Sequence, residues 1–227
     1  NNISHKNSNY GEYTFHYWIW KNNYKFPSNT WIGFCQYRKF WVKEKLKLSS
    51  NKFEDFKKIL LTSIPQDFQS YESILGRPMF INEFKFSKLI KKNFISILKK
   101  PSLIFDKEQR NIKFHFDTMH GDGNLDKAIK LLPKKDRDDF ENFVNTEVSF
   151  NPHNMFICNS QDILFKYYDS IFPWLLECEN EFGFRLEGYG LKRLYGFLAE
   201  RYMSFWFKKY TKYKTLPIIF KDISELK

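Results

Sequence analysis

Short apolar stretches alternate with amphipathic stretches along this chain, and the alternation limits the possible folds more than any other feature. Strands are predicted at residues 31–37, 73–81, 154–159 and 216–220, and at the start of the run IKFHFDTMHGDGN at 112–124. Helices are predicted at residues 8–23, 53–62, 125–132, 135–148, 161–182 and 190–210. Strands that alternate with helices favour an α/β fold over a helical bundle.

The helix ends carry local signals of their own. Asn9 and Glu12 have the spacing of a capping box in the first helix. Ser160 is a suitable cap for the helix at 161–182, inside which Pro173 should cause a kink or a split. Because no repeat, low-complexity tract or linker interrupts the sequence, residues 1–227 are predicted to form a single domain.

The chain is basic, with a formal charge of +11 and an isoelectric point near 9.4. Nucleic acid, an anionic membrane surface and phosphorylated substrates are the partners that such a charge suits. The excess consists of 30 Lys against 7 Arg, in a chain also rich in Asn, Phe and Ile, as an AT-rich coding sequence would produce. Since arginine is the residue suited to bidentate phosphate contacts, its scarcity argues against a nucleic-acid partner.

The sequence gives three indications of where the protein works. Three widely spaced cysteines fit neither a disulfide framework nor a zinc site, which favours a reducing, cytoplasmic setting. No signal peptide or membrane-spanning stretch is recognisable. The basic amphipathic segment KFSKLIKKNFISILKK at 85–100 could lie on an anionic membrane, or could be a charged surface helix that packs inward.

The stretch WIGFCQYRKF at 31–40 changes abruptly from apolar to polar and basic. Its first half is typical of a buried strand, and Gln36, Tyr37, Arg38 and Lys39 follow at the carboxyl end. Ligands of open α/β sheets bind outside the carboxyl ends of the strands. These four residues are therefore either a binding site or only a polar strand end.

Two further stretches could carry chemistry. In HFDTMHGDG, His115 and Asp117 would share a face of a strand, and Asp117 with His120 could bind a divalent metal or act as an acid/base pair. The alternative is a polar loop, and GDGN at 121–124 lacks the acidic spacing of a calcium loop. In RLYGFLAER, Arg193 and Glu200 would share a helix face, as a ligand site or as a structural ion pair.

Ordered motifs across the chain resemble a bacterial glycosyltransferase family of capsular and exopolysaccharide gene clusters, long described as a domain of unknown function. The motifs are NISHKN, YGEYTFHYWIWKN, WIGFCQYRKF, NMFICN and RLYGFLAERY. They are similar to the family pattern N-I-S-x-K-N, E-L-T-x-x-Y-W-I-W-K-N, I-G-x-x-H-Y-R-R, N-M-F-I and R-x-x-G-F-L-A-E-R-L. Gln36 replaces the usual His and Lys39 the second Arg, and residues 82–110 look like an insertion.

The resemblance implies a GT-A-like, Rossmann-type sheet that binds a nucleotide sugar. The first nucleotide-binding strand of the family would precede Asn1, so an N-terminally truncated domain is expected. Most GT-A enzymes neutralise the donor diphosphate with a metal held by Asp-x-Asp. Because residues 36–39 contain no carboxylate, Arg38 and Lys39 are predicted to do this instead, without a metal cofactor; Mn²⁺ or Mg²⁺ is the alternative.

The same resemblance suggests roles for individual residues. The base that activates the acceptor hydroxyl would be Asp117 or Glu200. Trp18 and Trp20 could stack on a sugar ring, although an aromatic helical stripe is more often core. The predicted donor-binding residues are Lys21, Gln36, Tyr37, Arg38, Lys39, His120, Asn154, Arg193 and Arg201.

The function that follows is transfer of a sugar from a nucleotide-sugar donor to a growing surface polysaccharide, by a hexosyltransferase. The donor would be a UDP-hexose, with UDP-galactofuranose as one candidate. The acceptor would be a glycan or a lipid-linked glycan, reached by a cytoplasmic protein at the inner face of the membrane. The alternative is a non-catalytic carbohydrate-binding or assembly module of a polysaccharide synthase.

Overall fold

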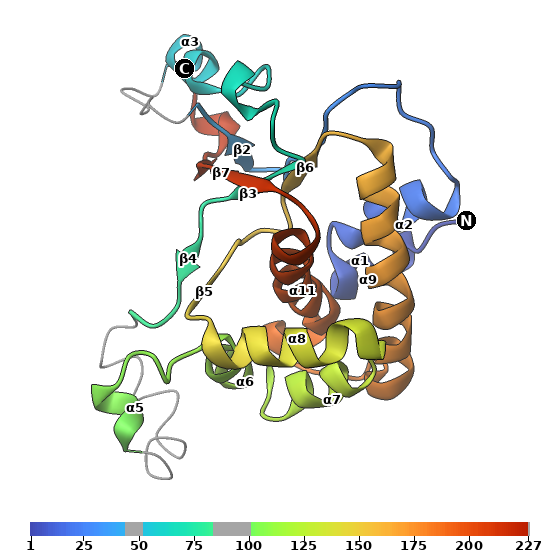
Figure 1. The fold of residues 1–227 in the computed structure, drawn as a ribbon, viewed down its shortest axis with the longest axis vertical. Coiled ribbons are helices and arrows are strands. Elements are labelled where there is room, and N and C mark those ends of the chain that lie inside the picture. Colours follow the sequence, from blue (N-terminus) through green and yellow to red (C-terminus); the bar gives the residue numbers. More distant parts are fainter. Residues whose placement is uncertain (44–51, 84–100, 227) are drawn as a thin grey trace.

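The computed structural model describes residues 1–43, 52–83 and 101–226, and its ribbon combines helices with short strands (Figure 1). The predicted α/β class is confirmed. The basic segment at 85–100 lies entirely outside the described residues, as does most of the insertion predicted at 82–110. No helix in the described ranges is both long and apolar enough to cross a membrane.

The central sheet has four strands, in the order β1 (Ile32–Gly33), β6 (Phe156–Cys158), β3 (Ser73–Gly76) and β7 (Tyr213–Leu216). β6 pairs antiparallel with both β1 and β3, whereas β3 and β7 run parallel. β2 (Lys39–Trp41) pairs with β8 (Ile218–Phe220), and β4 (Met79–Phe80) pairs with β5 (Ser149–Phe150). The predicted strands at 73–81, 154–159 and 216–220 are therefore present, in shorter form.

Most helices lie below this sheet or to its right in Figure 1, with α11 at the centre of the molecule and α9 beside α2. The N-terminal segments are η1 (Ser4–Lys6), α1 (Asn7–Tyr10) and α2 (Tyr13–Lys21). The middle of the chain forms α3 (Phe53–Ile59), η2 (Gln66–Phe68), α5 (Ser102–Phe105), α6 (Ile112–His120), α7 (Asn124–Lys130) and α8 (Lys134–Thr146). The last part forms α9 (Gln161–Phe182), α10 (Tyr189–Lys192), α11 (Leu194–Tyr210) and η3 (Ile223–Glu225).

A core rich in aromatic residues joins the sheet to these helices. Phe156 of β6 packs against Tyr167 of α9 and Phe207 of α11, with ring centroids 5.3 and 4.7 Å away. At the far end of α11, the fully buried Asp136 of α8 accepts hydrogen bonds from Tyr202 at 2.9 Å and Tyr210 at 2.5 Å. Apolar packing and this buried polar cluster together fix α11, which carries residues of the site.

The strand predicted at the start of 112–124 is wrong, because these residues form helix α6. The Asn111 side chain caps the helix by accepting a hydrogen bond from the backbone N–H of Phe114 at 2.9 Å. Its buried residues, Ile112, Phe116 and His120, follow each other at intervals of four, as one helix face requires. The apolar–polar alternation of IKFHF fits this periodicity as well as that of a strand.

Three other local predictions need correction. The strand expected at 31–37 is only Ile32–Gly33, because its partner β6 is short and the chain then turns at the bridge between Gln36 and Lys39. Asn9 and Glu12 form no capping box, since Gly11 divides the helix and Asn9 donates instead to the carbonyl of Lys192. Pro173 does not split α9, which continues through it.

Candidate active site

A cleft of about 1150 Å³ opens where three distant segments of the chain meet. The junction of α1 and α2 forms one wall, residues 33–39 form the second, and α10 with the start of α11 forms the third. The polar and charged side chains in its lining are Asn7, Ser8, Glu12, His16, Gln36, Arg38, Lys39, Lys192 and Arg193. A cleft of this size and polarity can hold a ligand larger than a single sugar.

One side of the cleft is strongly basic. Arg38 is half exposed, lies over the rings of Tyr37 and Phe220 and makes an ion pair of 3.2 Å with Asp222. Lys192 and Arg193 also line the cleft. Arg193 directly precedes α11, so the positive end of that helix dipole adds to the cationic field. This side of the cleft is suited to an anion such as a diphosphate.

A single carboxylate, that of Glu12, lies among these cations. Its Oε1 accepts hydrogen bonds from the side-chain amides of Gln36 and Asn154, both at 2.8 Å. Its Oε2 lies 3.8 Å from Nη2 of Arg193. Burial raises the pKa of Glu12 above its usual value and outweighs the hydrogen bonds and the Arg193 charge, which lower it. Glu12 thus has one fixed oxygen and one with capacity to accept a proton.

Gly11 allows Arg193 to approach Glu12. Its φ of +59° lies in the left-handed region, and a Cβ at this position would stand 2.7 Å from Nη2 of Arg193. Any other residue would therefore strain the backbone and displace the guanidinium. Gly11 therefore has two effects: it separates α1 from α2, and it leaves room for the Arg193 guanidinium beside Glu12.

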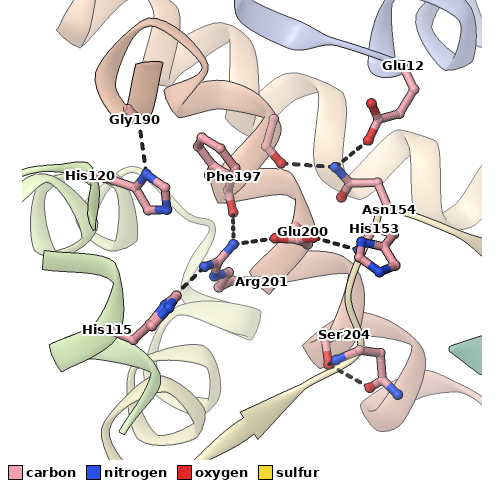
Figure 2. Close-up of polar contacts among 12 residues, drawn as sticks. Glu12, His115, His120, His153, Asn154, Gly190, Phe197, Glu200, Arg201 and Ser204 are labelled. Atoms are coloured by element: carbon pink, nitrogen blue, oxygen red, sulfur yellow. Dashed lines mark hydrogen bonds and ion pairs between the residues drawn. The ribbon is translucent and has the colours of Figure 1, made fainter. Parts of the chain in front are cut away.

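A strained turn supports Glu12 from behind. His153 and Asn154 have φ values of +80° and +51°, which non-glycine residues adopt rarely. Glu200 accepts the backbone N–H of His153 at 2.5 Å, and Asn154 donates both to Glu12 and to the carbonyl of Gly196 (Figure 2). Gln36 also donates to the carbonyl of His153. Consecutive strained residues held by side chains are typical of functional sites.

Glu200 is paired with Arg201, which is only 2% exposed. The guanidinium of Arg201 lies 4.1 Å from the ring centroid of Phe150 and also contacts the carbonyl of Phe197 and the ring of His115 (Figure 2). This pair borders a second cavity of about 400 Å³, next to the main cleft. Glu200 therefore lies behind the cleft wall and holds the strained turn.

The structure places the predicted site residues in three groups. Gln36, Tyr37, Arg38, Lys39 and Arg193 line the cleft. Asn154, Glu200 and Arg201 lie behind it. The others lie elsewhere: Asp117, His120, Lys21, Trp18 and Trp20 are in neither group.

Each residue of the last group has its own surroundings. Asp117 forms an ion pair of 2.7 Å with Lys113 on α6, and His120 contacts the carbonyl of Gly190 at 3.0 Å beside the second cavity. Both residues lie on helix α6 and not at the strand end that the sequence predicted. Trp20 donates to Asp169 at 2.7 Å, and the ammonium of Lys21 lies 3.9 Å over the Trp20 ring.

Glu12, Lys192 and Tyr189 also line the cleft and are not among the site residues predicted from the sequence. The sequence does contain a signal for Glu12, because this residue matches the first position of the family pattern E-L-T-x-x-Y-W-I-W-K-N. Its position before a helix suggested a capping role instead. Lys192 and Tyr189 carried no signal of their own in the sequence.

The described lining residues of the cleft do not form the ligand set of a divalent metal. Glu12 is its only acidic lining residue among the described residues, and its Oε1 already accepts two hydrogen bonds. No group of three His, Cys, Asp or Glu side chains suited to a metal occurs in the described parts of the chain. The charged groups gathered here are mainly cations, which fit an anionic ligand.

Comparison with known proteins adds a family and a fold. The sequence model of a family described as "Domain of unknown function (DUF4422)" matches residues 1–212. None of the curated proteins matches significantly. The fold is similar to the apo structure of the bifunctional glycosyltransferase WbbM, with a TM-score of 0.69, 22% sequence identity and 98% of this chain covered. The match spans 38% of the WbbM chain, and it supports the predicted GT-A-like fold.

Proposed function

This chain belongs to the DUF4422 family, and from this premise, its fold and its cleft we propose that it is a glycosyltransferase that takes a sugar from a nucleotide-sugar donor. The observation that carries the proposal is the arrangement of one partly buried carboxylate, Glu12, among cationic side chains of the cleft. Sugar transfer needs both elements, a base for the incoming hydroxyl and positive charge for the departing diphosphate.

The donor diphosphate would occupy the basic side of the cleft, against Arg38, Lys192 and Arg193. The exposed rings of Tyr37 and Phe220, on which Arg38 already lies, offer a stacking surface for the nucleobase. A UDP-hexose suits a cleft that offers cations for the diphosphate and aromatic rings for the nucleobase. UDP-galactofuranose is one candidate. Charge neutralisation by these side chains would stabilise the diphosphate as it leaves.

In the proposed reaction, an acceptor hydroxyl attacks the anomeric carbon while Oε2 of Glu12 takes its proton. A new bond forms between the acceptor oxygen and the anomeric carbon. The bond from that carbon to the donor phosphate oxygen breaks, and its electron pair leaves with the nucleoside diphosphate. The raised pKa of Glu12 makes it a better base than an exposed glutamate. Glu200, proposed from the sequence as the base, would instead hold the turn that positions Glu12.

We extend the proposal to the acceptor, the place in the cell and the need for a metal. The acceptor would be a growing surface polysaccharide or its lipid-linked precursor, and the protein would work in the cytoplasm, at the inner face of the membrane. No metal would be required, because the cations of the cleft take its place.

The alternative is a non-catalytic carbohydrate-binding or assembly module. Both functions predict glycan binding, but only the first predicts consumption of a donor. The test is to incubate the protein with a panel of UDP-hexoses, including UDP-galactofuranose, and to measure UDP release with and without oligosaccharide acceptors. UDP release from one donor, abolished in Glu12→Gln, supports the transferase. Glycan binding without turnover of any donor supports the alternative.

A further inference from the structure

An aromatic groove of about 450 Å³ continues from the active-site cleft along α2. We use "aromatic groove" for the surface lined by Phe15, Trp18, Ile19, Tyr24, Phe26, Ile32, Gly33 and Phe34. Phe15, Gly33 and Phe34 also line the cleft, so the two spaces share a wall. A ligand in the groove would therefore lead directly into the cleft.

The large side chains of this groove are unusually exposed. Phe15, Trp18 and Tyr24 are 55%, 37% and 46% exposed, although each could bury a large apolar area. Phe15 and Trp18 lie nearly parallel, with an interplanar angle of 9° and ring centroids 6.3 Å apart. Tyr24 follows, 5.8 Å from Trp18. Exposed aromatic faces in a row mark a binding surface more often than a core.

The polar properties of the groove point to an uncharged ligand. No charged residue lines it in the described parts of the chain. Of the six tryptophans, Trp18 is the one whose indole N–H has no partner among the described residues; the other five donate to protein oxygens. An exposed ring with an available N–H donor suits a polyol, which offers both apolar C–H faces and hydroxyl groups.

We propose that the aromatic groove binds the neutral sugar residues of the acceptor glycan and directs its terminal hydroxyl to Glu12. The inference rests on the proposed transferase function. A nucleotide is a poorer occupant, because the cations that suit its phosphates line the cleft and none of them lines the groove.

The spacing along the chain supports this direction. Glu12, Phe15 and Trp18 follow at intervals of three residues from the start of α2, so Trp18 lies about 9 Å along the helix from Glu12. On the facing wall, Phe34 borders the groove and Gln36, two residues later, contacts Glu12. Both walls thus run from aromatic groups to the carboxylate. Trp20, which the sequence offered as a second stacking residue, packs on Phe172 outside the groove.

The test measures glycan and nucleotide binding separately on the intact chain. The probes are UDP and three neutral hexasaccharides, cellohexaose, maltohexaose and β-1,4-galactohexaose, with hexagalacturonic acid as the charged comparison. The variants are Trp18→Ala and Tyr24→Ala, with Trp18→Phe to preserve a stacking face. Phe105→Ala removes a still more exposed ring that lies outside the cleft and the groove, and is the control. Saturation-transfer NMR reports contact, and titration gives each dissociation constant.

Wild-type protein should bind at least one neutral hexasaccharide in preference to the charged one. Trp18→Ala should weaken that binding about tenfold, with partial recovery in Trp18→Phe. UDP affinity should stay within about twofold of wild type in Trp18→Ala and in Trp18→Phe. The inference is overturned if no neutral hexasaccharide binds, if Trp18→Ala leaves glycan binding unchanged, or if it lowers UDP affinity instead. Failure of wild-type protein to bind UDP would count against the proposed donor and leave the glycan result to stand separately.

Discussion

The side-chain amide of Gln36 donates a 2.8 Å hydrogen bond to the carboxylate of Glu12, 24 residues earlier in the chain. This contact joins two walls of the cleft and fixes one carboxylate oxygen, while the other faces Arg193. It also accounts for Gln36 in a position where the related pattern has His, because either side chain can donate a hydrogen bond. Five predictions follow the chemistry of this carboxylate and its neighbours.

Replacing Glu12 by Gln should abolish most of the catalysis and leave the fold intact. The amide preserves size and one hydrogen-bonding oxygen but cannot accept the proton of the acceptor. We expect turnover to fall about 10²- to 10⁴-fold, measured as UDP release with acceptor present. Glu54→Gln, on an exposed helix face far along the chain, is the matched control and should keep full activity. Equal activity of Glu12→Gln and wild type would exclude Glu12 as the base.

The pH dependence of turnover should reflect two perturbed groups. Burial raises the pKa of Glu12 from its ordinary 4.5, so activity should be lost on the acid side at a pH above 4.5, where Glu12 becomes protonated. Burial lowers the pKa of Lys39 from its ordinary 10.5, so loss of its positive charge should reduce activity at a pH below 10.5. A rate profile with both limbs would support these assignments. In Lys39→Arg the alkaline limb should move upward, and an unmoved limb would assign it to another group.

Arg193→Ala should weaken nucleotide binding more than it alters the fold. Arg193 is partly exposed, contacts Tyr189 and Glu12, and faces the proposed diphosphate site. Loss of one charge-assisted contact should raise the dissociation constant of UDP about 10- to 100-fold, measured by calorimetry. Arg185→Ala, which changes an exposed arginine outside the cleft, should leave it unchanged. Comparable UDP affinity in Arg193→Ala and wild type would remove Arg193 from the donor site.

Chelation of divalent metals should have little effect on turnover. The cleft offers cationic side chains where a metal would need several carboxylates. Activity in 5 to 10 mM EDTA is therefore expected to remain within about twofold of the untreated value, since in the proposed mechanism arginine and lysine side chains neutralise the diphosphate. Loss of activity in EDTA that Mn²⁺ restores would contradict the proposed role of Arg38 and Arg193.

Arg201→Met should be strongly destabilising. The guanidinium is almost fully buried, and its removal leaves Glu200 without its ionic partner beside the strained turn. The free energy of unfolding should fall by about 3–5 kcal/mol, measured by urea denaturation. Lys57→Met breaks an exposed ion pair with Glu54 and should cost less than about 1 kcal/mol. A loss of similar size in both variants would show that the Glu200–Arg201 pair is not a buried support.

Local sequence signals predicted much of the architecture. The helix at 161–182 was predicted with its observed bounds, because the Ser160 cap and a long amphipathic pattern act within one segment. The strand in NMFICN was also found, as an apolar run between polar residues. The run at 112–120 was assigned wrongly because its alternation suits a strand, whereas the Asn111 cap and burial at every fourth residue select the helix.

The kinds of side chain at the site could be predicted from the sequence: an abrupt polar and basic cluster at residues 36–39 and a helix that carries Glu200 and Arg201. Which of these side chains contact one another depends on the folded structure. Glu12 becomes the central carboxylate because Gln36 and Asn154 reach it from 24 and 142 residues away, and its pKa is raised because those segments exclude water from it. Asp117, equally acidic in the sequence, faces Lys113 instead. Hydrogen bonding and burial depend on neighbours in space, and no spacing along the chain specifies them.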